Sequence, residues 1–262
     1  MKSAISMCCA ALVAALPVMA ETIPYDQVKQ FNGNVKATAD GFQIVKRCWM
    51  LGTKRIEFDP EAKYKVSVEL KIDAADAEKA RVNIGLHPMY QGQVVSGQQV
   101  FFVPGSDTEL AAPVKPGDTV ITVKDAFKWS AGSNTLVVFD CDPSGKLRDL
   151  PNRNSLGFIK SINRSKNEIT LAKPAKVALD AGTAVRQHQA TWSFLGNVKC
   201  PVTTEWQKFT VTTVPGVATG VRDNPRYKMW PKADALVPVI ATMTPLQFRN
   251  LTVEVVKEDA AK

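Results

Sequence analysis

The clearest pattern in the chain is a strict alternation of apolar and polar residues over Lys63 to Asp73, KYKVSVELKID. Every second residue from Tyr64 to Ile72 is apolar, and the residues between them are polar or charged. A period of two is typical of a strand in an antiparallel sheet that has one buried face and one face in water. We therefore predict a β-strand over this segment.

Shorter segments of the same kind occur before and after this strand. They read NVKAT, FQIVKR after the turn Asp40-Gly41, RVNIGL, ALVPVIATM and QFRNLTVEVV. The segment DAADAEKA is long enough for a single helical turn and no more. Many short strands with turn residues between them predict an all-β protein, either a sandwich or a barrel.

The segment from 108 to 190 has a different texture. Its short apolar runs are separated by the turn signals Pro-Gly-Asp, Ser-Ala-Gly, Pro-Ser-Gly and Asp-Ala-Gly, with few polar linkers. The outer strand pattern resumes at Trp192. We predict one β-sandwich built from residues 21–107 and 191–262, with residues 108–190 inserted as a small β-barrel of five or six strands.

The order of FDPEAKYKVSVELKI, RVNIGLHPMY, TEWQKFTVTTVPG and LQFRNLTVEVV resembles that of jelly-roll, galactose-binding-like sandwiches, which include many carbohydrate-binding modules. The resemblance implies an antiparallel jelly-roll β-sandwich and non-catalytic recognition of an extracellular or envelope glycan. The insert opens on G-D-T-x-I-x-V, which resembles small β insertions in surface and tail-fibre-like proteins. The alternative function is that of a structural or assembly protein whose insert mediates protein contacts.

The first twenty residues have the features of a secretory signal peptide. One early lysine precedes an apolar stretch, and small residues around Val18-Met19-Ala20 predict cleavage after Ala20. No other segment is apolar enough to span a membrane. We expect a secreted protein, located in the periplasm, on the cell surface or outside the cell.

The charges and cysteines add two expectations. The 33 basic and 25 acidic residues give a formal net charge of +8, but the basic residues are scattered, which favours attraction to acidic polymers over nucleic-acid recognition. After signal-peptide removal three cysteines remain, so at most one internal disulfide can form. Because the insert separates Cys141 from the outer domain, we predict a Cys48–Cys200 disulfide.

Aromatic residues in loops are the candidates for a carbohydrate site, because an aromatic face can stack on a sugar ring while polar side chains bind its hydroxyls. The loop DNPRYKMWPK is the strongest candidate; the alternative is that its tryptophan fills one end of the sandwich. Trp129 is expected in the core of the barrel or as its lid. The predicted carbohydrate-binding residues are Trp49, Tyr90, Asn224, Arg226, Tyr227 and Trp230.

Carboxylates in Glu57-Phe58-Asp59-Pro60-Glu61 suggest a further alternative, a retaining glycoside hydrolase. In such enzymes an E-x-D-x-E strand projects its carboxylates onto one face, and Glu57 and Glu61 would then be the catalytic pair. Pro60 argues against a continuous strand, since it removes a ladder donor. The competing interpretation is a strand that ends in a turn at Asp59 to Ala62.

The segment Asp140-Cys141-Asp142-Pro143-Ser144-Gly145 has the beginning of a calcium loop. Asp140, Asp142 and Ser144 would be the ligands of a structural calcium ion, and a plain Asx turn is the alternative. His87 and His188 are the two histidines, and their positions predict neither a zinc site nor a catalytic triad.

Overall fold

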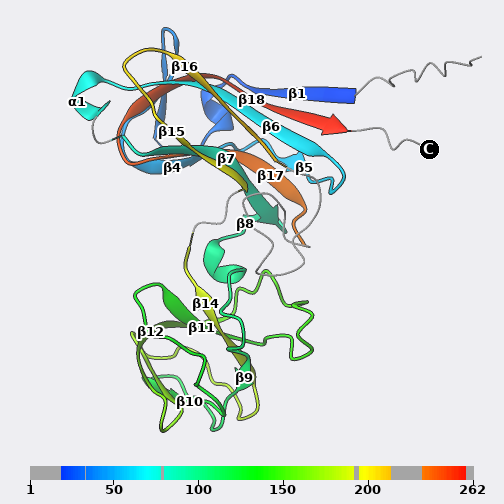
Figure 1. Ribbon diagram of the computed structural model, residues 1–262, viewed down its shortest axis with the longest axis vertical. Helices are drawn as coiled ribbons and strands as arrows, with labels where there is room; N and C mark the ends of the chain where they lie inside the picture. The colour runs from blue at the N-terminus through cyan, green and yellow to red at the C-terminus, as the bar shows by residue number, and fades with distance from the viewer. Residues whose placement is uncertain (1–18, 33, 78–79, 192–194, 214–231, 258–262) are drawn as a thin grey trace, which may run out of the picture.

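The protein consists of two lobes, a β-sandwich and an inserted β-domain (Figure 1). The computed structural model describes residues 19–32, 34–77, 80–191, 195–213 and 232–257. Strands dominate the described residues, and the helical elements are single turns: η1 (Val28–Gln30), α1 (Ala74–Ala77) and η2 (Gly97–Gln99). The predicted all-β class is confirmed.

Eight strands of the sandwich form two antiparallel sheets with the strand order of a jelly roll. The first sheet contains β16-β6-β18-β3 and the second β15-β7-β17-β4. The strands pair from the outside of the chain order inward: β3 with β18, β4 with β17, β6 with β16, and β7 with β15. This nested pairing is jelly-roll topology. The bounds are β3 (Gly41–Ile44), β4 (Cys48–Leu51), β6 (Lys63–Lys71), β7 (Val82–Tyr90), β15 (Leu195–Cys200), β16 (Gln207–Thr212), β17 (Ala235–Thr242) and β18 (Leu246–Lys257).

Four further strands complete these sheets. In the first sheet β1 (Met19–Tyr25) pairs with β18, and β2 (Val35–Thr38) pairs with β3. In the second sheet β5 (Ile56–Glu57) pairs with β17, and β8 (Gln93–Val94) pairs with β7. Residues 1–18 lie outside the described residues, so the signal peptide stays a prediction.

The third sheet is made entirely by strands between Thr108 and Gln189, in the order β10-β13-β12-β11-β14-β9. A bridge between Leu110 and Val123 joins β9 to β10 and so connects the two ends of this order into a barrel. The insert leaves the sandwich between β7 and β15, which are paired neighbours, so the insertion does not interrupt the jelly roll. The bounds are β9 (Thr108–Glu109), β10 (Val120–Thr122), β11 (Thr135–Phe139), β12 (Ser155–Asn163), β13 (Glu168–Leu171) and β14 (Ala184–Gln189).

The sandwich core is apolar and rich in aromatic rings. The alternating side chains of β6 face inward as predicted, with Val66 and Leu70 fully buried. At one edge Phe31 packs edge-on against Phe42 and against Phe248, each at 5.1 Å between ring centroids. Such edge-to-face contacts stabilise a pair beyond the area that it buries.

Strand β17 is buried on both faces, unlike the one-sided strands predicted for the sandwich. Its Pro238 lies in the interior of a sheet, where a missing N–H normally costs a ladder hydrogen bond. The structure avoids this cost because β4 ends at Leu51 and β5 begins at Ile56, and Pro238 faces the break between them. There the Gly52 N–H donates to the Pro238 carbonyl at 2.8 Å, and a side chain on Gly52 would lie 2.8 Å from the proline ring.

The predicted Cys48–Cys200 disulfide is wrong. Neither residue forms a disulfide. The two residues occupy one row across the second sheet: Cys200 pairs with Val82, Val82 with Thr242, and Thr242 with Cys48. Three strand spacings of about 4.8 Å separate their Cα atoms by roughly 14 Å, whereas a disulfide requires about 4.4–6.8 Å. The two cysteines lie on opposite edges of the same sheet.

A buried ion network orders the base of the insert, where β14 meets the chain that arrives from the sandwich. Arg186 on β14 is completely buried and pairs with Asp149 at 2.5 Å and with Asp107 at 3.3 Å. Its guanidinium also lies 4.9 Å from the centre of the Phe102 ring. We call Arg186, Asp149, Asp107 and His188 the buried ion network.

His188 links this network to η2. Its Nδ1 lies 2.8 Å from the Gln98 carbonyl, and its Nε2 lies 3.2 Å from Arg186 Nε. A carbonyl only accepts and a guanidinium only donates, so the ring is neutral with the proton on Nδ1. Burial and the neighbouring Arg186 charge lower the pKa of His188 to about 4, which agrees with a neutral ring.

Within the described part of the chain, no helix is both long and apolar enough to cross a membrane.

Candidate functional site

The structure describes two of the six residues predicted to bind carbohydrate. Asn224, Arg226, Tyr227 and Trp230 lie outside the described residues. Trp49 stands on the edge strand β4 with 38% of its surface exposed, and its ring lies 5.9 Å from that of buried His87. Burial lowers the pKa of His87 to about 4. The structure thus leaves Trp49 accessible on the second sheet.

Tyr90 belongs to the connection between the two lobes. Arg153 of the insert donates to the Tyr90 carbonyl at 2.8 Å, and its guanidinium lies 5.5 Å from the centre of the Tyr90 ring. Tyr90 also packs against an apolar cluster of Val95, Val100 and Leu150. These contacts give Tyr90 a role in holding the insert, which an isolated loop sequence did not reveal.

Trp129 and Trp206 both make structural contacts. Trp129 is 1% exposed and lies in the core of the insert, the first of the two places expected for it. Trp206 precedes β16, and its ring carries the Arg249 guanidinium at 4.3 Å and the Lys71 ammonium at 5.8 Å. Cation–π contacts of this kind occupy the ring face that a sugar would need.

The carboxylate strand required by the glycosidase alternative does not form. Strand β5 ends at Glu57, and the next residues turn: the Glu61 N–H donates to Asp59 Oδ1 at 2.9 Å, and the Ala62 N–H donates to the Asp59 carbonyl. A hydrogen bond from Lys257 is the main reason why the pKa of Asp59 is lowered. Glu57 and Glu61 therefore lie on a strand end and on a turn, as the competing interpretation proposed.

The segment predicted to bind calcium folds as an Asx turn. Asp142 accepts the Ser144 N–H at 2.9 Å and the Arg148 N–H at 3.0 Å, and hydrogen bonds from Ser144 and then Arg148 lower its pKa to about 2. Asp140 accepts from the side-chain amide of Asn154. Among the described residues no group of three or more His, Cys, Asp or Glu side chains could hold a metal ion.

A cleft of about 460 Å³ opens on the first sheet where the ladder beside β18 is interrupted. Strand β3 pairs with β18 only as far as Phe248, and β1 pairs with it only from Leu251. Between these points Asn250 adopts a positive φ of 53° within a bulge. We call this opening between β1, the β2–β3 turn and residues 249–252 the edge cleft.

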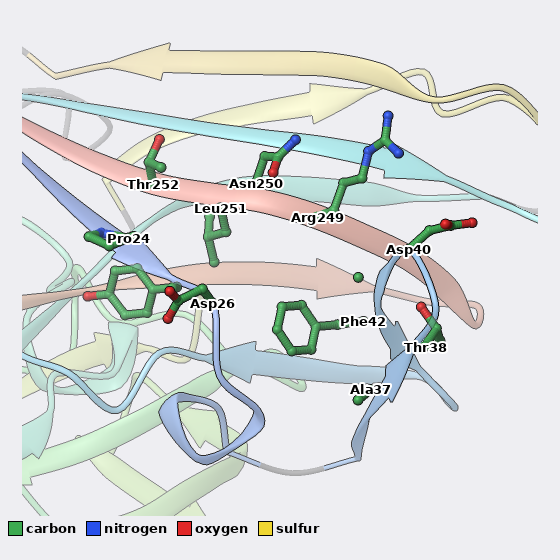
Figure 2. Close-up of a pocket in the computed structure, with 12 residues that line it drawn as sticks. Pro24, Asp26, Ala37, Thr38, Asp40, Phe42, Arg249, Asn250, Leu251 and Thr252 are labelled. Carbon is green, nitrogen blue, oxygen red and sulfur yellow. The ribbon is translucent and has the colours of Figure 1, made fainter.

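The edge cleft has an apolar interior and acidic lips (Figure 2). Phe42 and Leu251 point into the gap, while Asp26 and Asp40 lie on opposite sides of it. Arg249 and Asn250 point away, to the outer face, where both donate to Glu69 at 2.7 and 2.9 Å. Those two hydrogen bonds, that from Asn250 first, lower the pKa of Glu69.

The carboxylates of Asp26 and Asp40 remain available, because neither makes a hydrogen bond or ion pair with another described side chain. A gap with apolar walls and a few polar groups on its rim is a typical setting for a ligand or for a partner side chain. The sequence contained the Asp40-Gly41 turn, but it could not show that this turn faces the end of β1.

A second surface, on the insert, was not anticipated. Phe127 is 71% exposed, the largest exposed fraction among the large apolar side chains of the described residues. It lies in residues 124–130 between β10 and β11, which we call the 124–130 loop. Alternation would put Phe127 and Trp129 on the same face of a strand, because they are two residues apart. No sequence signal therefore marked Phe127 as the exposed one of the two.

The sheets define an all-β protein with a jelly-roll sandwich and a β-barrel insert. No protein-family model matches the chain, and no curated protein matches it. Among solved structures, VP17, a capsid protein of bacteriophage P23-77, is 11% identical over 93% of this chain and 99% of that chain, with a TM-score of 0.15.

Proposed function

We propose that this is a non-catalytic assembly protein, in which the jelly roll is a platform and the insert makes protein contacts. The observation that carries the proposal is the exposure of Phe127 in a loop whose backbone is fixed. Aromatic side chains are enriched at protein interfaces, where they serve as anchors. The contacts of Arg153 with Tyr90, which hold the insert to the sandwich, support the same function, because a held lobe loses less freedom when it binds.

The 124–130 loop is held at both ends and in the middle. Asp125 accepts the Phe127 N–H at 2.7 Å, and Asn167 accepts the Ala126 N–H at 3.1 Å. Ala126 and Trp129, on either side of Phe127, are buried in the insert core. The backbone therefore presents Phe127 to solvent in one orientation, although the loop lies beside an apolar core.

Photo-crosslinking tests this function. A variant with benzoylphenylalanine at position 127, produced in the cells from which the protein comes, should form an adduct with another polypeptide on irradiation. Phe158 is the matched control, since it is an exposed phenylalanine of the same insert, at 41% exposure. Adducts at 127 and not at 158, identified by mass spectrometry and weakened in binding by Phe127→Ala, support the proposal. No adduct at 127, or equal adducts at both positions, contradicts it.

Carbohydrate recognition is the second candidate function, and the edge cleft favours it. Its apolar interior and the free carboxylates of Asp26 and Asp40 suit a sugar, whose ring has apolar C–H faces and a rim of hydroxyl donors. A glycan array should then show a specific ligand, and Asp40→Asn should weaken binding at least tenfold. Asp180→Asn, an exposed carboxylate of the insert, is the control. A protein that retains no glycan, or binds equally after Asp40→Asn, argues against this candidate.

A further inference from the structure

One positive charge lies beside Phe127, and two more lie on a neighbouring turn. The Lys128 ammonium lies 5.4 Å from the centre of the Phe127 ring. Arg164 and Lys166, both exposed, lie in the turn between β12 and β13. This turn is fixed against the 124–130 loop because Arg164 donates to the Trp129 carbonyl at 2.5 Å and Asn167 donates to the Lys124 carbonyl at 3.2 Å.

The nearby acidic groups do not neutralise this surface. Asp125 uses one carboxylate oxygen to accept the Phe127 N–H. Glu109 pairs with Lys124 at 2.6 Å. Lys128, Arg164 and Lys166 then stand against the single charge of Asp125, which leaves an excess of two positive charges. The surface is therefore a projecting aromatic side chain with an excess of positive charge nearby, and we call it the Phe127 knob.

The edge cleft has the complementary features. Its interior is apolar, its lips carry the free carboxylates of Asp26 and Asp40, and its volume of about 460 Å³ exceeds that of any single side chain. A projecting phenylalanine needs a concave apolar partner in order to be buried, and this chain itself contains one. Opposite charges around the two sites would set the orientation of the contact.

We propose that the Phe127 knob of one molecule binds in the edge cleft of a second copy. The knob lies on the insert and the cleft lies on the sandwich, which form separate lobes (Figure 1). The contact therefore joins different surfaces of the two molecules and repeats head to tail, giving a ring or a filament. This inference rests on the proposed assembly function and names its partner as the same chain.

Sedimentation velocity over a range of protein concentrations tests the inference with the purified protein. Wild type should associate, and the apparent dissociation constant should rise at least tenfold in Phe127→Ala and in Asp40→Lys. Both residues are exposed, so these variants should keep the melting temperature of wild type. Phe158→Ala and Asp180→Lys are the matched controls and should associate like wild type. Higher salt should weaken association, since the charged groups lie at the surface.

A charge exchange makes the test specific. Lys128→Glu and Asp40→Lys should each weaken self-association, and a mixture of the two should recover part of it, because the new glutamate of one variant meets the new lysine of the other. Asp26→Lys replaces Asp40→Lys if the latter perturbs its turn. Association that is unchanged in Phe127→Ala and in the lip variants overturns the inference, as does failure of the mixture to recover.

The two proposals fail in distinguishable ways. If wild type stays monomeric while position 127 crosslinks to a different polypeptide, the self-association inference is wrong and the assembly function stands. If wild type is monomeric and position 127 gives no adduct, both are wrong. If a glycan whose binding is weakened by Asp40→Asn also abolishes self-association, the edge cleft is the shared site and the inference is supported.

Discussion

The sandwich and the base of the insert are ordered by different kinds of interaction. The sandwich core contains apolar and aromatic side chains such as Leu86, Phe248 and Val253, which are at most 1% exposed. The base of the insert contains a fully buried arginine whose charge is balanced by Asp149 and Asp107. Packed apolar side chains tolerate exchange for others of similar volume, whereas a buried ion requires its partners.

This difference indicates what each region contributes. The sandwich gains most of its stability from burial, which is not directional. The buried ion network adds directional contacts among β14, η2 and the loop that carries Asp149, and so fixes how the insert leaves the sandwich. We expect the insert base to be the more sensitive region to single polar substitutions.

Asp149→Ala should have the largest effect, a loss of about 3–5 kcal/mol in stability, because it leaves buried Arg186 with one carboxylate partner. That partner, Asp107, has a side chain that is 47% exposed and is therefore screened by water. Denaturant unfolding gives the loss. Hydrogen exchange shows where it falls: amides of β11 and β14 should exchange faster, while those of β17 should change little.

Leu86→Ala is the matched change in the sandwich. The cavity that it creates should lower the free energy of unfolding by about 2–5 kcal/mol, and the amides that exchange faster should now be those of β7 and β17.

The double variant Arg186→Met with Asp149→Leu should recover much of the stability lost in Asp149→Ala. If Asp149→Ala is as stable as wild type, the buried ion network does not order the insert.

The pH dependence should be the next largest effect, and it involves one histidine in each region. The pKa values of His87 and His188 are each about 4 in the folded protein, against about 6.5 when unfolded. Between these values the unfolded chain binds more protons, so stability is complete above pH 6.5 and falls as the pH drops toward 4. Each histidine should contribute a loss on the order of a few kcal/mol.

Urea unfolding at pH 7 and pH 4.5 measures this loss. In His188→Gln the dependence should be roughly halved, since Gln does not titrate and its amide can still donate to the Gln98 carbonyl. The remaining dependence reports His87 in the sandwich. An unchanged pH dependence in His188→Gln would show that this ring is not the titrating group.

The sequence predicted the jelly roll better than it predicted the sites, for physical reasons. The residues of β6 alternate with a period of two because one face of this strand is more exposed than the other, so their pattern predicted the strand. The continuous apolar run ALVPVIA in β17 in principle signals burial on both faces. Its Pro238 depends on a break between β4 and β5, which local sequence does not specify.

The sites depend on contacts between distant segments. Arg186 in AVRQHQ resembles a surface residue until Asp149 and Asp107, which are 37 and 79 positions away, are placed beside it. The edge cleft requires β1 and β3 to share one side of β18, which follows from sheet order alone. Cys48 and Cys200 belong to one domain, but strand order, not domain membership, decides whether they can meet.

A smaller effect concerns the bulge at the edge cleft. Asn250→Val should destabilise the sandwich by about 1–2 kcal/mol, because a β-branched residue does not readily adopt the left-handed φ of 53°. Asn250→Gly should cost less, since glycine adopts this conformation freely and only the hydrogen bond to Glu69 is lost. Thermal unfolding of the two variants provides the comparison. Equal losses would show that the hydrogen bond, and not the backbone conformation, fixes the bulge.

The smallest expected effect is that of reductant, and it compares cysteines in both regions. Burial raises the pKa of Cys200 in the sandwich and of Cys141 in the insert to about 12 each. Cys48 is only partly buried, so in the native protein iodoacetamide at pH 8 should modify it fastest.

Because no disulfide links Cys48 to Cys200, adding reductant should leave the melting temperature unchanged. A fall of several degrees on reduction, with a mass increase of two hydrogens, would show that an internal disulfide had been present.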